Sequence, residues 1–487
     1  MADIRIDILA HADFSGRLRR SKRAPGAGVF AAQIEKQRRQ NPDGTVLLDA
    51  GDEFSTTFWP GRPMVGSVAL RKTDAMTLGN HEFDRGEDFL NDCIACADFP
   101  ILCANIVRKA DGELIPGCRP WVMLERKGVR IGVLGVTTEY TPYMVTASSF
   151  APFEARSCAE AVKKYLPQMR QAGAQITVLL AHIPFYSDEN GVISGELADL
   201  LRQIPPVDVC IGGHIPGDYA GLWNDTVVLK GGFSGKSLCH ATLHYDTEQC
   251  RVTQRTAQVH LTDWNDPPVE PDQSYAERVT APFRDFFEKP LTTATETMRI
   301  RLSAETKLGN FLAQSVQEAA NVQFAYMNAT SSGGAIEAGT VTAEDITGVM
   351  GFNDPILTSQ MTGRQIWELF ELVYEPERYG NNAGLMFSGV IVRIDHTKPA
   401  FSKVQEITLR DGTPLEPERV YTVATSEYMA SGGNDTSKIA NQLSWKPLGV
   451  LMYDALFAAI ERHHAIFASP ERRLIETGTP ENDNAPF

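Results

Sequence analysis

The sequence predicts a two-domain α/β protein. With 487 residues the chain is too long for one ordinary hydrophobic core, and its hydrophobic fraction of 43% is ample for burial. From residue 1 to about 262, short runs rich in β-branched residues alternate with helical stretches, a pattern typical of sheets layered with helices. Residues 263–272 then turn to proline and acid, which indicates a linker.

The N-terminal domain, residues 1–262, is predicted to contain short buried strands between helices. A short apolar run bounded by turn residues is typical of a buried strand, whereas apolar residues three and four apart indicate an amphipathic helix. These patterns predict strands at residues 4–9, 46–48, 75–78, 130–136, 176–180, 207–211 and 226–230, and helices at 27–40 and 158–171.

Residues 263–289 are predicted to form a linker with a bridging helix at about 274–287. The second domain, residues 290–475, again mixes strands and helices. Residues 476–487 are polar and contain proline, so we expect a disordered tail. The elements predicted in the second domain are strands at 323–327, 355–360, 390–394, 404–409 and 420–425, and helices that end at 320 and span 363–374 and 448–463.

Charge and cysteine content favour a soluble protein with small partners. The 46 Lys and Arg residues against 61 Asp and Glu residues give a net charge of −15, which argues against a general nucleic-acid or membrane-surface binder. No apolar run approaches about 18 residues, and the first strand begins near Met1, so we expect neither a membrane span nor a leader. The cysteines are scattered, as in reduced cytoplasmic proteins, and Cys93 and Cys96 lack a second pair for a metal site.

Polar side chains follow several of the predicted strands at the point where each ends. Because α/β sheets bind ligands at the carboxyl ends of their strands, we expect these side chains to converge. Imidazole, carboxylate and amide groups together suit Mn, Zn, Co or Fe better than Ca or Mg. The sequence therefore predicts a transition-metal site built from Asp52, Asn80, His182 and His214.

The order of these motifs, beginning at Asp13, resembles that of the calcineurin-like metallophosphoesterases. Gly-Asn-His-Glu-Phe-Asp at residues 79–84 resembles the 5′-nucleotidase and UDP-sugar hydrolase branch. The resemblance implies a four-layer α/β/β/α metallophosphatase domain followed by a smaller α/β domain of the 5′-nucleotidase C-terminal type. It also implies a metal-dependent hydrolase in nucleotide catabolism that acts on a nucleotide or another small phosphorylated metabolite. Further stretches that resemble this branch are residues 104–105, 132–138, 227–236, 305–310 and 431–434.

The resemblance also implies a role for each motif residue. Asp52 would bridge two divalent ions, and a metal-bound hydroxide would attack phosphorus in line. His81 would stabilise charge on the transferring phosphoryl group, held by Asp84 three residues on. The metal ligands that the resemblance implies are Asp13, Asp52, Asn80, His182 and His214.

The site of the first ion departs from the family pattern. The family has Asp-x-His where this chain has Asp13-Phe-Ser15, and His or Gln where it has Pro216 after His214. One firmly bound ion is therefore expected, and the second stays open. His11 lies two residues before Asp13 on an extended strand and is a further candidate ligand, although an ordinary hydrogen-bonded histidine is the favoured interpretation. A phosphoester-binding or regulatory protein without turnover is the first alternative to an enzyme.

The substrate pocket implied for the second domain departs as well. The arginine that helps to bind the nucleotide in the family falls on Gly333. Of two aromatic positions that would stack a base, one falls near Gly384 and the other on Tyr428. A small phosphorylated substrate is still expected, while its base or sugar and the oligomeric state of the protein stay open. The substrate-binding residues that the resemblance implies are Asn328, Tyr428, Asn434 and Asp435.

A basic loop, residues 17–23, directly follows the altered first motif. A solvated loop is the ordinary interpretation of such a run of charge. Its position after Asp13 also suggests that it attracts anionic substrate to the metal edge. This gives a second alternative, an oligonucleotide phosphodiesterase, although the chain lacks the basic groove with interleaved aromatic residues typical of such proteins. The cations of the loop are Arg17, Arg19, Arg20, Lys22 and Arg23.

Overall fold

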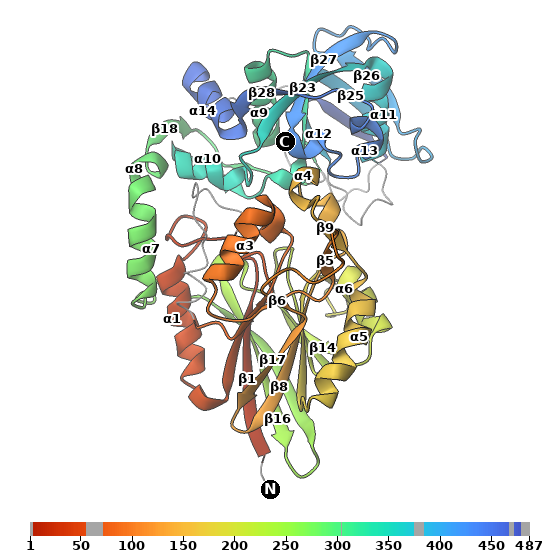
Figure 1. The fold of residues 1–487 in the computed structure, drawn as a ribbon. Helices are drawn as coiled ribbons and strands as arrows, with labels where there is room; N and C mark the ends of the chain where they lie inside the picture. The colour runs from red at the N-terminus through yellow and green to blue at the C-terminus, as the bar shows by residue number, and fades with distance from the viewer. Residues whose placement is uncertain (1–2, 55–71, 303, 375–383, 467–471, 479–487) are drawn as a thin grey trace. The chain divides into compact units, whose positions relative to one another are not determined.

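The chain divides into two compact units, residues 1–282 and 283–487. The computed structural model describes residues 3–54, 72–302, 304–374, 384–466 and 472–478 (Figure 1). Each unit has its own core of buried aliphatic and aromatic side chains, which is typical of separate domains. Among the described helices, none has the length and apolar character needed to cross a bilayer.

Two β-sheets form the body of the first unit. The strand order is β17-β16-β1-β2-β3-β4-β6 in one sheet and β14-β15-β13-β10-β8-β7 in the other. The strands of the first sheet are β1 Asp3–His11, β2 Thr45–Asp49, β3 Ala75–Thr77, β4 Ile101–Leu102, β6 Cys118–Arg119, β16 Ser237–Asp246 and β17 Arg251–Leu261. Those of the second are β7 Trp121–Arg126, β8 Val129–Thr137, β10 Ile176–His182, β13 Val209–Gly212, β14 Tyr219–Trp223 and β15 Thr226–Lys230.

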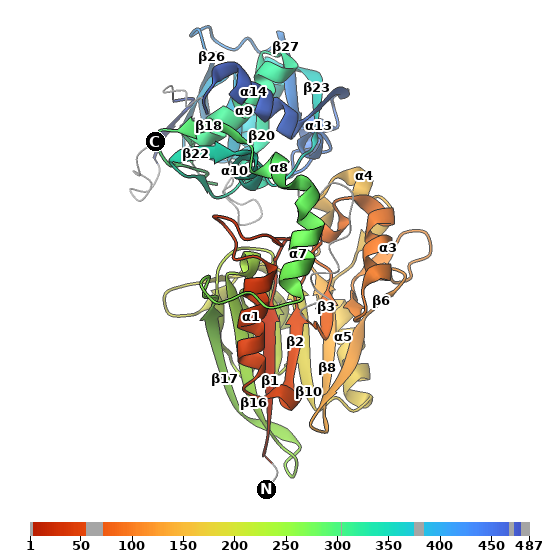
Figure 2. The ribbon, with the colours of Figure 1, turned by 90° about the vertical axis from the view of Figure 1, so that its left-hand side faces the viewer.

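The two sheets face each other across the main core of this unit. Because side chains alternate along a strand, β1 sends Ile6, Ile8 and Ala10 into this layer, where Val178 and Val209 enter from the second sheet. Helices cover the outer faces, with α1 and α7 side by side over the first sheet and α5 and α6 over the second (Figure 2). The unit is therefore the predicted four-layer α/β/β/α structure. The bounds are α1 Ala27–Arg38, α3 Gly86–Cys96, α5 Cys158–Gln171, α6 Glu196–Gln203 and α7 Asp272–Thr280.

Parallel pairing gathers the strand ends that carry the motifs. In the first sheet β1 is parallel to β2 and β2 to β3, and in the second sheet β13 is parallel to both β10 and β15. Strands β1 and β10 run two residues further than predicted, so that His11 and His182 are their last residues. The candidate ligands therefore lie in, or just before, the loops that leave one edge of the sandwich.

The second unit combines a five-stranded sheet, β24-β20-β27-β23-β28, with a three-stranded sheet, β26-β25-β29. The hydroxyls of Thr306 and Thr362 cap α9 and α11 by accepting backbone N–H bonds. The strands are β20 Phe324–Asn328, β23 Pro355–Thr362, β24 Leu385–Ser388, β25 Val390–Asp395, β26 Val404–Leu409, β27 Val420–Ser426, β28 Lys446–Leu451 and β29 Leu474–Thr477. The longer helices are α9 Lys307–Ala320, α11 Gly363–Val373 and α14 Met452–His463.

Three predicted segments differ in the structure. The helix predicted at 448–463 begins at Met452, because the residues before it form β28, an edge strand antiparallel to β23. The bridging helix is divided into α7 and α8 (Arg284–Phe287) around Pro282, since proline lacks an N–H and disfavours a helical residue before it. The predicted tail begins later than residue 476, because β29 pairs with β25 as far as Thr477, and residues 479–487 lie outside the described residues.

Candidate functional site

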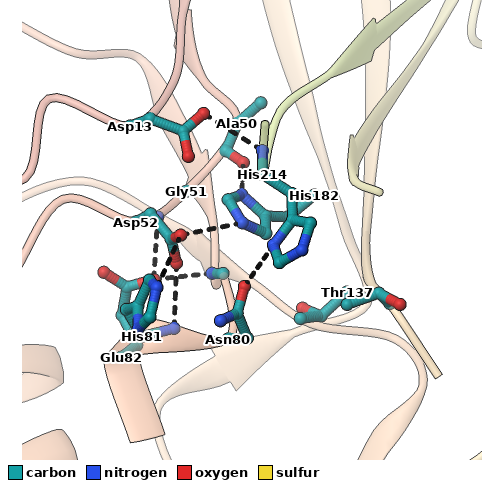
Figure 3. A network of polar contacts seen from close by, with 12 residues as sticks. Asp13, Ala50, Gly51, Asp52, Asn80, His81, Glu82, Thr137, His182 and His214 are labelled. Carbon is teal, nitrogen blue, oxygen red and sulfur yellow. Dashed lines mark hydrogen bonds and ion pairs between the residues drawn. The ribbon is translucent and has the colours of Figure 1, made fainter. Parts of the chain in front are cut away.

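Sharp turns after the strands bring the predicted ligands of the first unit together (Figure 3). Asp13, Asp52 and His214 adopt left-handed backbone conformations, with φ of 56°, 59° and 74°. Non-glycine residues rarely adopt this conformation, so neighbouring contacts must hold it. Asp13 N donates to Gly51 O at 2.8 Å, and Ser15 N donates to Asp52 O at 3.1 Å. The loops after β1 and β2 are therefore fastened to each other.

Asp52 and two histidines form the centre of the site. Asp52 Oδ2 lies 3.1 Å from His182 Nε2, and the ligating atoms of Asp52, His182 and His214 all lie within 4.8 Å of one another. Asn80 joins this group, since its Oδ1 lies 2.7 Å from His214 Nδ1. The other ring nitrogen of His182, Nδ1, lies 2.6 Å from Ala50 O (Figure 3). His182 is thereby oriented with Nε2 toward Asp52.

This donor set fits a divalent transition metal. A carboxylate, two imidazoles and an amide oxygen are ligands that Mn, Zn, Co and Fe accept. His182 Nε2 lies 3.1 Å from Asp52 Oδ2. Burial acts to lower the pKa of His182, but the charge of Asp52 outweighs it and raises the pKa to about 9, so an ion bound here would take the place of a proton on this ring. Burial and the nearby His182 lower the pKa of His214 to about 3, so its ring is neutral at pH 7 and can ligate.

His81 and Asp84 form a pair beside this centre. The chain leaves β3 and enters a 3₁₀ turn, His81–Phe83, which places Asp84 Oδ2 2.9 Å from His81 Nδ1. His81 N also donates to Asp52 Oδ1 at 2.9 Å. Burial alone would lower the pKa of His81, but the carboxylates of Asp84 and Asp52 outweigh it and raise the pKa to about 10. A cationic imidazole held in this way can stabilise negative charge that develops in a transition state.

Glu82 holds the loops that carry candidate ligands, a role that the motif did not reveal. Its Oε2 accepts N–H bonds from Asp52 at 2.9 Å (Figure 3) and from Gly79 at 2.6 Å. Its Oε1 accepts N–H bonds from Glu53 at 2.8 Å and Phe54 at 3.0 Å. Burial and the charge of Asp52 raise the pKa of Glu82 to about 7, while the N–H donors act in the opposite direction. This carboxylate accepts hydrogen bonds from backbone N–H groups of the Asp52 loop that would otherwise lack partners.

The position of the first ion is incomplete. Asp13 is buried, and its Oδ2 accepts a bond from His214 N at 3.1 Å. The Ser15 hydroxyl donates to the backbone oxygen of Asp13 at 3.3 Å, and Pro216 has no ligating side-chain atom. Across the described ranges, no group of three or more ligating His, Cys, Asp or Glu side chains includes Asp13. Among the described residues, this position therefore offers fewer ligating side chains than the position around Asp52.

His11 belongs to a different group and is not brought to Asp13. Its Nδ1 lies 3.9 Å from Asp49 Oδ1, and the ligating atoms of His11, Asp49 and Glu53 lie within 4.8 Å of one another. His11 and Asp49 are paired across β1 and β2, and the His11 ring contacts Phe30 of α1 edge-on at 5.3 Å between centroids. The extended-strand argument for His11 fails because the backbone turns to a left-handed conformation at Asp13.

The residues predicted to bind substrate in the second unit also lie together. The Tyr428 hydroxyl donates to Asn434 Oδ1 at 2.9 Å and accepts from Asn434 N at 3.0 Å. Asn328 Nδ2 donates to the Thr330 hydroxyl at 2.7 Å, which in turn lies 3.5 Å from Asn434 Oδ1. Asp435 follows Asn434, and both have positive φ. Sequence reasoning did not identify Thr330, which connects these two groups.

Tyr374 stands close to Gly384, where the second aromatic side chain was expected. A Cβ added to Gly384 would lie 3.1 Å from the Tyr374 hydroxyl, so this tyrosine fills part of that space. A small pocket here is lined by Arg301, Glu305 and Asn310 together with Tyr374 and Gly384. No sequence pattern pointed to Tyr374, because it lies at the end of α11 and meets Gly384 only through the fold.

Comparisons with known proteins agree with this architecture. Residues 290–441 match the family model of the 5′-nucleotidase C-terminal domain. A snake venom 5′-nucleotidase from Gloydius brevicauda is 25% identical over 96% of this chain and 88% of its own length. Endonuclease YhcR from Bacillus subtilis is 23% identical over 87% of this chain, which spans only 35% of that relative. The crystal structure of a 5′-nucleotidase precursor from Thermus thermophilus shares the fold with a TM-score of 0.83 at 19% identity, covering 98% of this chain and all of that one.

These matches confirm the resemblance that the motifs indicated. The model match lies in the second unit, and the relative and the solved structure extend the likeness through the first unit. The chain is therefore similar to two-domain 5′-nucleotidases in sequence and in fold, and its residues 290–441 match the model of the 5′-nucleotidase C-terminal domain.

Proposed function

We propose that the chain is a metal-dependent hydrolase of a phosphoester in a nucleotide or another small phosphorylated metabolite, with one firmly held ion. The observation that carries this proposal is the convergence of Asp52, His182 and His214 beside the His81 and Asp84 pair. An ion held there would supply a Lewis acid and lower the pKa of a water ligand. The name of the snake venom relative supports a 5′-nucleotidase type of substrate.

The side chains around the ion each have a task in such a reaction. His81, held beside the carboxylates of Asp84 and Asp52, would donate to a phosphoryl oxygen as charge builds up on it. Asp84 would hold Nδ1 of that ring and leave Nε2 for the substrate. Glu82 would keep the Asp52 loop in place. Phosphoryl transfer depends mainly on positioning and electrostatics, and this arrangement offers both.

A panel of phosphoesters and a matched pair of histidine variants test this proposal. The metal-loaded full chain should release phosphate from an aryl phosphate or from a nucleoside monophosphate. His81→Ala should lower kcat/KM at least about 100-fold with metal content unchanged, because His81 acts on the substrate and not on the ion. The control is His244→Ala on β16, which pairs with Asp3 at the opposite end of β1 and should leave kcat/KM unchanged.

The alternative is a phosphoester-binding protein without turnover, which the incomplete position at Asp13 favours. If the chain at full metal occupancy binds nucleotides by calorimetry and hydrolyses none of the panel, this alternative replaces the proposal. Hydrolysis that is lost in His81→Ala excludes it.

We also propose a cytoplasmic location, on the basis of the cysteines. All eight are free, and five of them, Cys93, Cys103, Cys158, Cys210 and Cys239, are buried. Burial raises the pKa of the Cys103 and Cys158 thiols, so they are unreactive. Fractionation of the native host with a tagged chain tests this location, and recovery outside the cytoplasm contradicts it.

A further inference from the structure

Three buried side chains at the ends of β1 and β2 form a second group of potential metal ligands. His11 and Asp49 are paired across these two parallel strands, and Glu53 lies on the loop that leaves β2. The ligating atoms of the three side chains lie within 4.8 Å of one another, and His11 Nδ1 is 3.9 Å from Asp49 Oδ1. This group shares no residue with the group of ligands around Asp52.

The distances within this group are close to those of a coordination shell. Ligand atoms about 2.1 Å from a metal ion lie roughly 3 to 4 Å from one another in tetrahedral or octahedral geometry. Imidazole and carboxylate donors in combination suit Mn, Zn and Fe. A neutral imidazole and two carboxylates together carry two negative charges, equal and opposite to the charge of one divalent ion. Whatever further contacts these side chains make, a small contraction of the group would give an ion three ligands.

The fold holds the three ligands in place from separate directions. His11 is the last residue of β1 and is fixed by strand pairing. Gly51 N donates to Asp49 Oδ1 at 3.0 Å, which orients that carboxylate. Glu53 N donates to Glu82 Oε1 at 2.8 Å, which anchors the backbone at the third ligand. Because the ligands are ordered before an ion arrives, binding has a smaller entropic cost.

The group lies in the interior of the first unit. His11 is 1% exposed, and Asp49 and Glu53 are 0% exposed. The His11 ring packs edge-on against Phe30 of α1 with 5.3 Å between centroids, and Phe30 stacks on Phe14. An apolar shell of this kind limits the access of water to a metal ion. An ion among these side chains would therefore hold the chain together and would not contact a substrate.

We propose that His11, Asp49 and Glu53 bind a second divalent transition-metal ion, which joins the end of β1 to the loop after β2. It binds more weakly than the ion around Asp52, because three protein ligands are one fewer than in a typical closed metal site. Asp49 and Glu53 stand on either side of Asp52 in the sequence, so this ion would steady the loop that carries Asp52. Binding of this ion does not require that the chain hydrolyse phosphoesters.

Crystals of the full chain soaked in MnCl₂ test the site without any substitution. Anomalous scattering should locate one Mn²⁺ beside Asp52 and a second at about 2.0–2.3 Å from ligand atoms of His11, Asp49 and Glu53. If the second position shows no anomalous peak, or if the second ion lies beside Asp13 in its place, the inference is overturned. A peak at the second position alone would support the inference and contradict the ion of the proposed function.

Conservative variants test the same site in solution. After dialysis against excess MnCl₂, elemental analysis should find about two ions in the unmutated chain and about one in Asp49→Asn or Glu53→Gln, because an amide is a weaker ligand than a carboxylate. The control is Asp7→Asn, which changes another buried carboxylate of the first sheet and should keep about two ions. Circular dichroism verifies that each variant is folded. Metal content that is unchanged in both ligand variants overturns the inference.

Discussion

The two halves of the predicted metal centre differ in how completely the fold builds them. Around Asp52, the side chains of Asn80, His182 and His214 converge from the ends of separate strands, with Nε2 of His182 directed at the carboxylate of Asp52. Around Asp13, the neighbouring Ser15 is hydrogen-bonded to backbone and no comparable ligand group forms in the described residues. In the described residues the two positions along this sandwich edge thus differ in their ligands, because each ligand comes from its own loop.

The largest expected effect distinguishes the ligand group around Asp52 from the position at Asp13. His182→Ala should remove the bound ion and lower kcat/KM at least about 1000-fold, because it deletes a buried ligand. Ser15→Ala should change neither metal content nor kcat/KM by more than about threefold. Elemental analysis and phosphate-release assays on both variants measure this difference. A comparable loss in Ser15→Ala would show that the half around Asp13 does hold an ion.

Glu82→Gln tests whether the ligand group around Asp52 depends on the carboxylate that holds its loop. The amide nitrogen of glutamine would face two N–H donors that now have a carboxylate oxygen, so we expect a loss of about 3 kcal/mol in the free energy of unfolding. Urea denaturation measures it, with Glu160→Gln at an exposed position of α5 as the control. A loss below about 1 kcal/mol would mean that the loops hold without this carboxylate.

Asp84→Asn separates the expected catalytic role of the His81 and Asp84 pair from metal binding around Asp52. Asp84 touches the ring of His81 and none of the predicted ligands, so the variant should lose about 10- to 100-fold in kcat and retain its ion. Steady-state kinetics and elemental analysis on the same sample provide both readings. Loss of the ion together with kcat would place Asp84 in the metal site instead.

Asp7, in the middle of β1, allows a comparison with the end of that strand at the site. Burial alone would raise the pKa of Asp7, but hydrogen bonds from His240, Thr242 and Asn41 hold it well below its usual range. A depressed carboxyl pKa stabilises the fold above about pH 4 and loses that contribution as pH falls further. Asp7→Asn should therefore cost about 2 kcal/mol at pH 7 and progressively less below pH 4.

Urea titrations of the Asp7→Asn variant at several pH values test this expectation. Unchanged metal content in the variant would confirm that the polar group around Asp7 is independent of the site. A penalty that stays constant down to pH 3 would mean that the carboxylate charge contributes nothing.

The smallest expected effect is a gain in metal content. Ser15→His together with Pro216→Gln supplies the family-type side chains beside Asp13, and should raise the metal content from about one ion per chain toward two. Any rise in kcat/KM should be no more than a few-fold, since the rest of that half has diverged. Unchanged metal content would show that the backbone around Asp13, and not only its side chains, excludes the ion.

The sequence predicted the layered fold and the group of ligands around Asp52, because both depend on local patterns. Buried apolar runs indicated the strands, and parallel pairing then gathered Asp52, Asn80, His182 and His214 at their ends. Contacts between residues far apart in the sequence could not be predicted. Glu82 binds the Asp52 loop although about thirty residues separate them in the sequence, and His11 lies beside Asp49 because of the register between β1 and β2. The late start of α14 was missed because β28 depends on its partner β23.

The left-handed backbone at Asp13, Asp52 and His214 bears on how this site should be dissected by mutagenesis. Alanine has no polar side chain to support that conformation, so it would combine the loss of a ligand with about 1 kcal/mol or more of added strain. Glycine accepts a positive φ without a Cβ penalty and removes the same ligating atom. At these three positions a glycine scan reports on chemistry more cleanly than an alanine scan, whereas at His182, inside a strand, alanine is the appropriate choice.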